Sequence, residues 1–301
     1  RPTRDPGQPR RREWPLVDAL RGVCLVFMGI AHFGGPLAPI TWQPLGFVSV
    51  AEVFFFLSGF IAGTSCTRVV RRTGGDARPW DVGRRVRRIY VAHLVTVALG
   101  AGGLLVATSL TSPAAELRQF WPALFEAPVA AVALAAALLA TPPPLDILPL
   151  YVAFVLTVPW VVGQCRRGRW KHAIAASLSL WAVSQVTMGR LGHWATRLLP
   201  GADPPDFDLL AYQLPFVLGI LVGWDVVVRG SADRWRLGAG RLAAVGAAAA
   251  MLCVARRVVA EDTFAAQLLV GRPSFGPIRA VNFALLALLA LNARVRLARW
   301  V

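Results

Sequence analysis

The chain has 301 residues, of which 56% are hydrophobic and only 16% charged, and its formal net charge at pH 7 is +16. Soluble domains contain about 45–50% apolar residues, so a soluble fold of this composition would expose apolar surface that it cannot cover. The basic residues lie in short clusters between apolar runs. This pattern argues against a nucleic-acid-binding face and is typical of the cytoplasmic loops of a membrane protein.

The chain begins with a polar, basic and proline-containing stretch, residues 1–13, which predicts a disordered cytoplasmic tail. Residues 14–301 are predicted to form one all-α domain, a polytopic transmembrane helix bundle. A helix needs about 20 apolar residues to cross the hydrocarbon core, and a lipid-exposed backbone must satisfy its own hydrogen bonds. Eight stretches meet this requirement: residues 16–33, 46–66, 89–110, 145–164, 172–189, 209–228, 237–255 and 277–293.

The first span, residues 16–33, carries three ionisable residues, which are costly in a membrane and therefore candidates for function. Asp18 and Arg21 are three positions apart and so lie on one face of the helix. His32 follows Arg21 by eleven residues, close to three turns, and falls on nearly the same face. We group all three as candidate catalytic residues, with His32 as general base. The alternative for His32 is a polar cap at the helix end.

The second span, residues 46–66, contains Glu52 part-way down from its outer end. The first two spans are antiparallel neighbours joined by a short loop, so His32 and Glu52 both belong to the outer half of the membrane. A carboxylate beside an imidazole fixes its tautomer and stabilises the imidazolium that forms on proton abstraction. We therefore expect Glu52 to orient His32. The alternative is a buried carboxylate that holds helices together.

An arginine-rich segment opens the third span and contains Arg84, Arg85 and Arg88, followed by Tyr90. Guanidinium groups match phosphate oxygens in shape and charge. These four residues are candidates to hold the nucleotide end of an acyl-carrying cofactor at the cytoplasmic face. The alternative is the ordinary positive-inside anchoring of a membrane helix.

Residues 122–141 are apolar enough to form a short span. Counting them as a full crossing would place the basic cluster Arg166–Lys171 outside the cell, against the positive-inside rule. We therefore expect a helix that lies in the outer interface or re-enters between other helices.

Isolated polar residues mark the later spans. Asp146 stands just before a span and either binds a sugar hydroxyl or caps the helix N-terminus, two roles that are compatible. Gln213 is a second candidate for substrate binding. Interhelical hydrogen bonding is the default role for Gln213 and for Asn282. The four cysteines form no metal-ligand spacing, so no metal is expected.

Six basic clusters set the orientation. With a cytoplasmic N-terminus and eight crossings, all of them come out on the cytoplasmic side, as the positive-inside rule requires. The clusters are Arg10–Arg12, Arg68–Arg72, Arg84–Arg88, Arg166–Lys171, Arg229–Arg236 and Arg294–Arg299.

Three motifs in the N-terminal third resemble the acyltransferase-3 superfamily of membrane acyltransferases. VDALRGVCLVFMGIAH carries the Arg-x10-His pattern with Arg21 and His32, EVFFFLSGFIAG resembles the second-helix motif, and RRVRRIY resembles the arginine-rich start of the third helix. Within that superfamily the chain is most similar to the OpgC family, the osmoregulated periplasmic glucan succinyltransferases. The segments that favour this branch are AEVFFFLSGF, RIYVAH, LDILPLYVAFVLTVP, YQLPFVLG and FGPIRAVNF.

The resemblance covers most of residues 15–290 and implies several roles. His32 would be the catalytic histidine, Arg21 part of the same site, and Arg84 and Arg88 contacts to acyl-CoA. Asn282 stands where the family leads us to expect a histidine. The resemblance implies about two further helices, so either the protein ends in the cytoplasm at this point or the C-terminus is shortened here.

Together these features predict a membrane-bound O-acyltransferase of the bacterial cytoplasmic membrane. It would move an acyl group, most simply succinyl from succinyl-CoA, to hydroxyls of an extracytoplasmic glycan. No serine or cysteine stands beside His32 in the sequence, which favours direct transfer. The alternatives are a transporter, although no internal repeat is present, and a non-catalytic partner in an envelope complex.

Overall fold

The computed structural model describes residues 14–33, 35–74, 81–110, 114–142, 145–187, 206–230, 235–259 and 263–297. The regular structure of these residues is helical, apart from an isolated bridge between Leu45 and Val48. The prediction of an all-α bundle is confirmed for this part of the chain. The predicted tail, residues 1–13, lies outside the described residues.

Each predicted span corresponds to a helix whose bounds differ from the predicted ones by at most two turns. These helices are α1 (Pro15–Phe33), α3 (Val50–Arg72), α4 (Val82–Leu110), α8 (Ile147–Arg166), α9 (Trp170–Thr187), α10 (Leu209–Arg229), α11 (Ala239–Ala255) and α13 (Pro277–Leu297). By length and composition α1, α3, α4, α8 and α10 can cross a membrane, and α11 and most of α13 are shorter apolar helices. The remaining described helices are α2 (Ala38–Trp42), α5 (Ala114–Arg118), α6 (Pro122–Glu126), α7 (Pro128–Ala136) and α12 (Phe264–Val270).

Side-chain caps mark the starts of several helices, among them α3 and α4. The hydroxyl of Ser49 accepts a hydrogen bond from the N–H of Ala51, so α3 begins after it. The carboxylate of Asp81 accepts one from the N–H of Arg84 at 2.7 Å. The arginine-rich segment therefore forms the first turns of α4.

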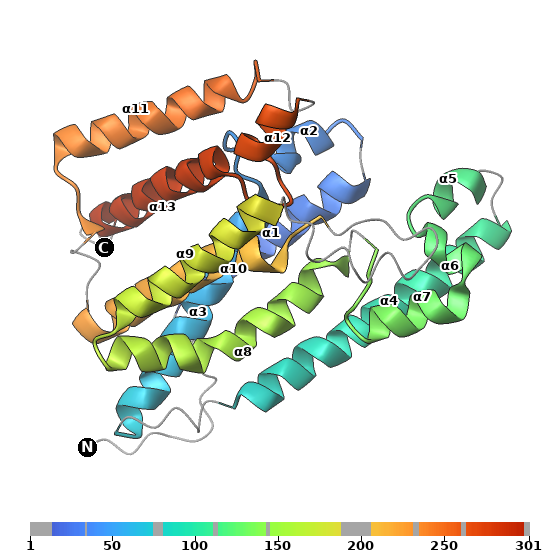
Figure 1. The fold of residues 1–301 in the computed structure, drawn as a ribbon, viewed down its shortest axis with the longest axis horizontal. Coiled ribbons are helices and arrows are strands. Elements are labelled where there is room, and N and C mark those ends of the chain that lie inside the picture. Colours follow the sequence, from blue (N-terminus) through green and yellow to red (C-terminus); the bar gives the residue numbers. More distant parts are fainter. Residues whose placement is uncertain are drawn as a thin grey trace.

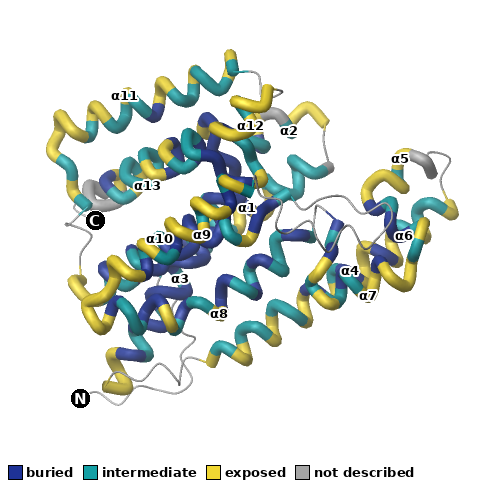
Figure 2. Tube along the Cα trace, in the orientation of Figure 1, coloured by how far each residue is buried: buried dark blue, intermediate teal, exposed yellow. Residues whose placement is uncertain are grey.

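The helices differ strongly in how much of their surface is covered. Figure 1 shows α3 and α10 in the middle of the bundle, with α11 and α13 on one side and α4 with α5 to α7 on the other. Buried residues concentrate on α3, α8 and α10, whereas α11 is largely exposed (Figure 2). Many exposed side chains are large and apolar, such as Leu99 on α4 and Met251 on α11. Such a surface suits contact with lipid.

The centre of the bundle is a close contact between the parallel helices α3 and α10, each of which contributes a pair of glycines. Gly59 and Gly63 of α3 lie against the backbone of α10, and Gly219 and Gly223 of α10 lie against the backbone of α3. A Cβ added at Gly63 would stand 2.7 Å from the carbonyl oxygen of Ile220. Small residues let the two backbones approach each other, which is how helices pack tightly within a membrane.

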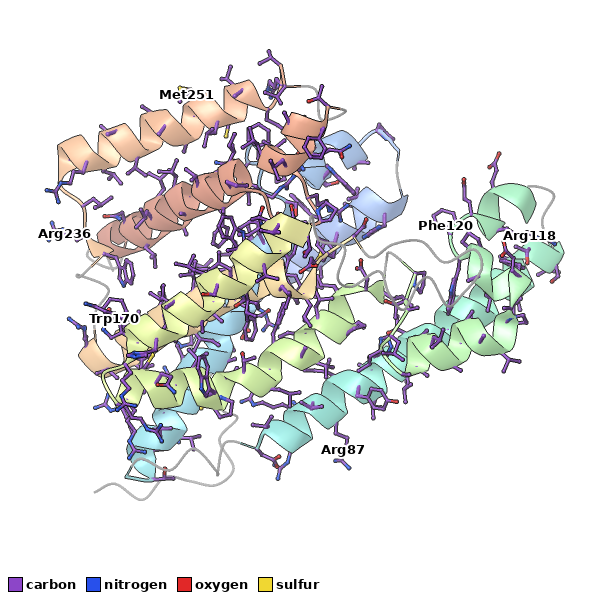
Figure 3. The ribbon with its side chains drawn as sticks, viewed as in Figure 1. Arg87, Arg118, Phe120, Trp170, Arg236 and Met251 are labelled. Carbon is purple, nitrogen blue, oxygen red and sulfur yellow. The ribbon has the colours of Figure 1, made fainter. Side chains whose placement is uncertain are left out.

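The arginine clusters gather at one end of the bundle, called here the arginine end. There α3 ends at Arg72, α8 at Arg166 and α10 at Arg229, and α4 carries Arg84 in its first turn. Figure 3 shows Trp170 and Arg236 toward this end and Arg118 and Phe120 far from it. The C-terminal end of α1, which carries His32, lies at the opposite end, called here the His32 end (Figure 1).

Residues 122–141 form two short helices and do not cross the bundle. α7 packs along α4, with the buried Ala131 and Ala135 in a cluster with Val97 and Ala101. Its end is held by two contacts to α4: the carbonyl of Ala135 lies 2.8 Å from Nε2 of His93, and the carbonyl of Ala136 accepts a hydrogen bond from Tyr90. The segment therefore packs against α4 as two short helices, and the interfacial and re-entrant arrangements both stay predictions.

Candidate active site

His32 stands in the last turn of α1 and opens onto a small cavity at the His32 end. The volume of the cavity is about 20 Å³, which admits one water-sized group. Its walls come from distant parts of the sequence, since α1, the end of α2, the start of α3 and two later segments contribute. The other lining residues are Met28, Ala31, Trp42, Ser49, Val50, Ala51, Phe207 and Arg272.

Arg272 is the charged residue that the fold brings to this cavity beside His32. Its guanidinium lies 4.2 Å from the ring centroid of Trp42 and 4.6 Å from that of Phe207. It pairs with the carboxylate of Asp206 at 3.2 Å. Its Nε is buried and has no hydrogen-bond acceptor among the described residues.

The segment that carries Arg272 is tied to the ends of two long helices. The hydroxyl of Tyr212 in α10 donates to the carbonyl of Arg272 at 2.8 Å. Trp181 of α9 donates from its indole to the carbonyl of Phe275 at 2.9 Å. These bonds fix the backbone of residues 272–275 over the His32 end. Sequence reasoning missed Arg272, although an isolated arginine outside the basic clusters was a usable signal.

Asp146 belongs to the same region but does not cap α8, because its side chain makes no capping hydrogen bond. Its carboxylate instead accepts a hydrogen bond from the backbone N–H of Asp206 at 3.0 Å. Burial, and secondarily the neighbouring charge of Asp206, raise the pKa of Asp146 well above the usual range of an aspartate. The expected capping role is therefore wrong, while sugar binding stays a prediction.

Glu52 does not pair with His32, contrary to the expectation from the sequence. The Glu52 carboxylate accepts hydrogen bonds from Ser49, from the hydroxyl of Tyr212 at 3.3 Å and from the guanidinium of Arg279 at 3.3 Å. Glu52 and Arg279 are fully buried. The carboxylate thus joins α3 to α10 and α13, which is the structural alternative considered for it.

Arg279 completes a polar tie between α13 and the loop before α3. Besides Glu52, its guanidinium donates to the carbonyls of Phe47 and Val270. Asn282, one turn further along α13, accepts a hydrogen bond from the N–H of Phe47 at 2.9 Å. Asn282 therefore has a structural contact at the position where the resemblance leads us to expect a histidine.

Arg21 and Asp18 lie on one face of α1, as their spacing predicts, with 3.6 Å between charged atoms. Arg21 also donates to the hydroxyl of Ser58 at 3.1 Å and lies 5.5 Å from the ring centroid of Phe54, both on α3. Eleven residues of helix separate Arg21 from His32 by about 16 Å. Arg21 does not line the His32 cavity.

The residues proposed for the nucleotide lie at the arginine end, with different contacts. Arg85 donates to the hydroxyl of Ser65 at 2.7 Å, and Arg84 pairs with Asp81 on the surface at 3.0 Å. Arg88 is exposed. The hydroxyl of Tyr90 is occupied by its bond to α7.

A second group of arginines lines a cavity of about 440 Å³ at the same end. Arg68, Arg71 and Arg72 belong to α3 and face the end of α10 across this cavity. Arg71 donates to the carbonyl of Val227 at 2.7 Å. Sequence reasoning treated this cluster as anchoring alone.

Gln213 of α10 forms hydrogen bonds to α9. The hydroxyl of Ser177 donates to its side-chain oxygen at 2.7 Å, and its amide nitrogen donates to the carbonyls of Ser177 and Leu210. Its amide is therefore occupied, which is the interhelical role considered for it.

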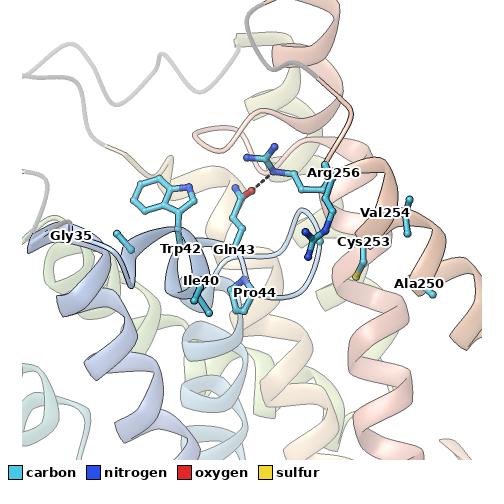
Figure 4. Close-up of a pocket in the computed structure, with 12 residues that line it drawn as sticks. Gly35, Ile40, Trp42, Gln43, Pro44, Ala250, Cys253, Val254 and Arg256 are labelled. Atoms are coloured by element: carbon cyan, nitrogen blue, oxygen red, sulfur yellow. Dashed lines mark hydrogen bonds between the residues drawn. The ribbon is translucent and has the colours of Figure 1, made fainter.

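A large open pocket of about 1190 Å³ lies at the His32 end between the loop around α2 and the C-terminal half of α11. Arg256 donates to the side-chain oxygen of Gln43 at 2.6 Å, and Arg257 also lines the pocket (Figure 4). Trp42 belongs both to this pocket and to the His32 cavity. The indole of Trp42 therefore lines both the open pocket and the His32 cavity.

Comparison with known proteins identifies the family. A family model described as OpgC protein matches residues 12–301, nearly the whole chain. The chain belongs to the OpgC family. Membership of the OpgC family suggests a membrane glucan-modifying acyltransferase. No curated protein and no solved structure matches the chain.

For this OpgC-family chain, the candidate base, its expected carboxylate partner and the candidate donor-binding arginines lie in three separate places. His32 lies at a cavity, together with Arg272. Glu52 lies in a buried network beside that cavity. The arginines of α3 and α4 lie at the other end of the bundle, where positive charge is available for a phosphate-bearing group.

Proposed function

We propose that this protein is an O-acyltransferase of the bacterial cytoplasmic membrane, with its N-terminus in the cytoplasm. It transfers an acyl group from acyl-CoA, with succinyl-CoA as the favoured donor, to hydroxyls of an extracytoplasmic glucan. The observation that carries this proposal is the wall of Trp42 between the His32 cavity and the open pocket. An acceptor sugar in that pocket would contact Trp42, which also lines the His32 cavity.

The open pocket has the chemistry of a sugar site. The indole of Trp42 offers an apolar face to a sugar ring. Gln43, Arg256 and Arg257 supply hydrogen-bond donors for hydroxyl groups. The pocket is also wide enough for several sugar units, since small-ligand pockets measure about 300–1,000 Å³.

The donor enters from the arginine end. The phosphates of acyl-CoA bind there, either at Arg84, Arg85 and Arg88 of α4 or in the cavity lined by the α3 arginines. The pantetheine arm carries the thioester toward His32. Because the His32 cavity admits only one water-sized group, a side chain in its wall moves when the acyl group arrives.

In the transfer step His32 accepts the proton of the acceptor hydroxyl. The hydroxyl oxygen attacks the carbonyl carbon of the thioester, a C–O bond forms, and the C–S bond breaks. The thiolate of coenzyme A takes the proton from the imidazolium. Glu52 positions the loop before α3, because Ser49 donates a hydrogen bond to Glu52 and also lines the His32 cavity.

The proposal is tested with His32→Gln, which keeps the size and polarity of the side chain but removes the base. Acylation of envelope glucans, measured by mass spectrometry in cells that express the variant, is expected to fall by about 10²- to 10⁴-fold. His172→Gln is the matched control, because His172 is an exposed helical histidine at the arginine end. Full acylation by a folded His32→Gln protein would overturn the assignment and favour a non-catalytic role.

A further inference from the structure

Arg272 is held in a way that leaves only the edges of its guanidinium for hydrogen bonding. Its Cζ lies over the rings of Trp42 and Phe207, 4.2 and 4.6 Å from their centroids, and these aromatic faces accept no conventional hydrogen bond. Its side chain is only 16% exposed. The backbone of its segment is bonded to α9 and α10, so the position of the guanidinium is set by the fold.

The guanidinium edge formed by Nε and Nη2 is only partly paired. Nη2 pairs with the carboxylate of Asp206 at 3.2 Å, whereas Nε, which lies on the same edge as Nη2, is buried and donates to no acceptor among the described residues. A buried donor without an acceptor costs about 1–3 kcal/mol, so proteins rarely retain one without a reason. A ligand that supplies an acceptor at Nε would explain its retention.

A carboxylate is the group that best matches a guanidinium edge, because its two oxygens accept two parallel N–H bonds. Arg272 and His32 line the same cavity, so a ligand bound to Arg272 lies next to the proposed base. The other cavity residues are mainly apolar, and among them Met28, Ala31 and Val50 suit the methylene groups of a short acyl chain.

We propose that Arg272 binds the free carboxylate of the transferred acyl group and thereby selects a dicarboxylic acyl donor over a neutral one. This inference rests on the proposed function and specifies its donor. A neutral acyl group leaves Nε unpaired in the bound state, and sites built for a polar group reject analogues that lack it. Asp206 holds the guanidinium in place but shares its charge, so it weakens the bond to the donor.

The test compares succinyl-CoA with butyryl-CoA, whose acyl chain has a methyl group in place of the carboxylate. Purified protein in lipid nanodiscs is given each donor with a glucan oligosaccharide, and kcat/KM is measured for both. Arg272→Gln is expected to lower kcat/KM for succinyl-CoA by roughly a hundredfold and to leave butyryl-CoA within about threefold. Arg272→Lys keeps the positive charge but lacks the parallel N–H donors of a guanidinium. Its kcat/KM for succinyl-CoA should therefore lie between the values for the wild type and for Arg272→Gln.

Asp206→Asn separates donor binding from a purely structural role for Arg272. If Arg272 binds the donor, this variant keeps or increases the preference for succinyl-CoA, since the guanidinium is no longer shared. If Arg272 only holds Asp206, both variants lose activity equally with the two donors, which would overturn the inference but not the proposed function. Wild-type protein that transfers neither acyl group would overturn the proposed function and this inference with it.

Discussion

At the scale of single residues, the buried pair of Glu52 and Arg279 shows how this bundle treats charge. Both side chains are fully buried, and each also bonds to neutral groups, Glu52 to Tyr212 and Ser49 and Arg279 to two backbone carbonyls. Desolvating two charges is costly, and the cost is offset only when each has a full set of partners. The pair therefore holds α3 and α13 together beside the site. Removal of one charge leaves the other buried without a counter-charge.

Glu52→Gln is expected to destabilise the protein by about 3–5 kcal/mol, because Arg279 keeps its charge without a counter-charge. Unfolding of the detergent-solubilised protein, followed by heat or denaturant, measures this change. Glu116→Gln is the control, since Glu116 is exposed on α5 and should change stability by less than about 0.5 kcal/mol. A folded Glu52→Gln protein of unchanged stability would show that the ion pair does not stabilise the bundle.

At the scale of elements, the bundle is organised by the contact between α3 and α10. Their glycines place backbone against backbone, and aromatic side chains such as Phe55 and Phe216 fill the space around the contact. Burial by lipid tails and by protein is similarly favourable for an apolar side chain, so tight packing rather than apolarity holds these helices together. The same contact brings Glu52 of α3 next to Tyr212 of α10.

Gly59→Ala tests this contact with a single methyl group. The added Cβ would overlap the carbonyl of Phe216, so α3 and α10 must move apart, at an expected cost of about 1–3 kcal/mol in the free energy of unfolding. Gly102→Ala is matched to it, because the space around Gly102 in α4 is open and alanine favours helix. Equal stabilities for the two variants would contradict the close contact.

At the scale of the whole molecule, charge and cavities are divided between two ends. The arginine end offers cationic groups and a cavity beside α3, whereas the His32 end holds the open pocket and the imidazole. Positive charge at membrane helix ends marks the cytoplasmic side. A donor made in the cytoplasm and an acceptor outside it would therefore reach the site from opposite directions.

The orientation is tested by single cysteines in a cysteine-free background. Arg118→Cys on α5 is expected to react with a membrane-impermeant maleimide in intact cells. Arg87→Cys on α4 should react only after the membrane is permeabilised, because the proposed orientation places the arginines around it at the cytoplasmic face. The reverse pattern, or equal labelling of both in intact cells, would contradict a cytoplasmic N-terminus.

The sequence by itself determined the helical class and the positions of the spans. It also determined the grouping of the arginines, because length and apolarity are local properties that the bilayer imposes on each segment separately. The expectation that residues 122–141 do not form a full crossing came from the same charge rule. Arg21 and His32 were likewise found by their cost inside a membrane.

Only the tertiary structure decided which polar groups meet. Glu52 and Arg279 are 227 residues apart, and no spacing rule joins them. Arg272 reaches His32 because residues 272–275 are bonded across the ends of α9 and α10. In a soluble protein, the alternation of apolar and polar residues predicts which positions are buried. In a membrane helix, the positions that face lipid and those that face the protein core are similarly apolar. Helix partners, and the site formed where they meet, therefore depend on packing that the sequence pattern does not reveal.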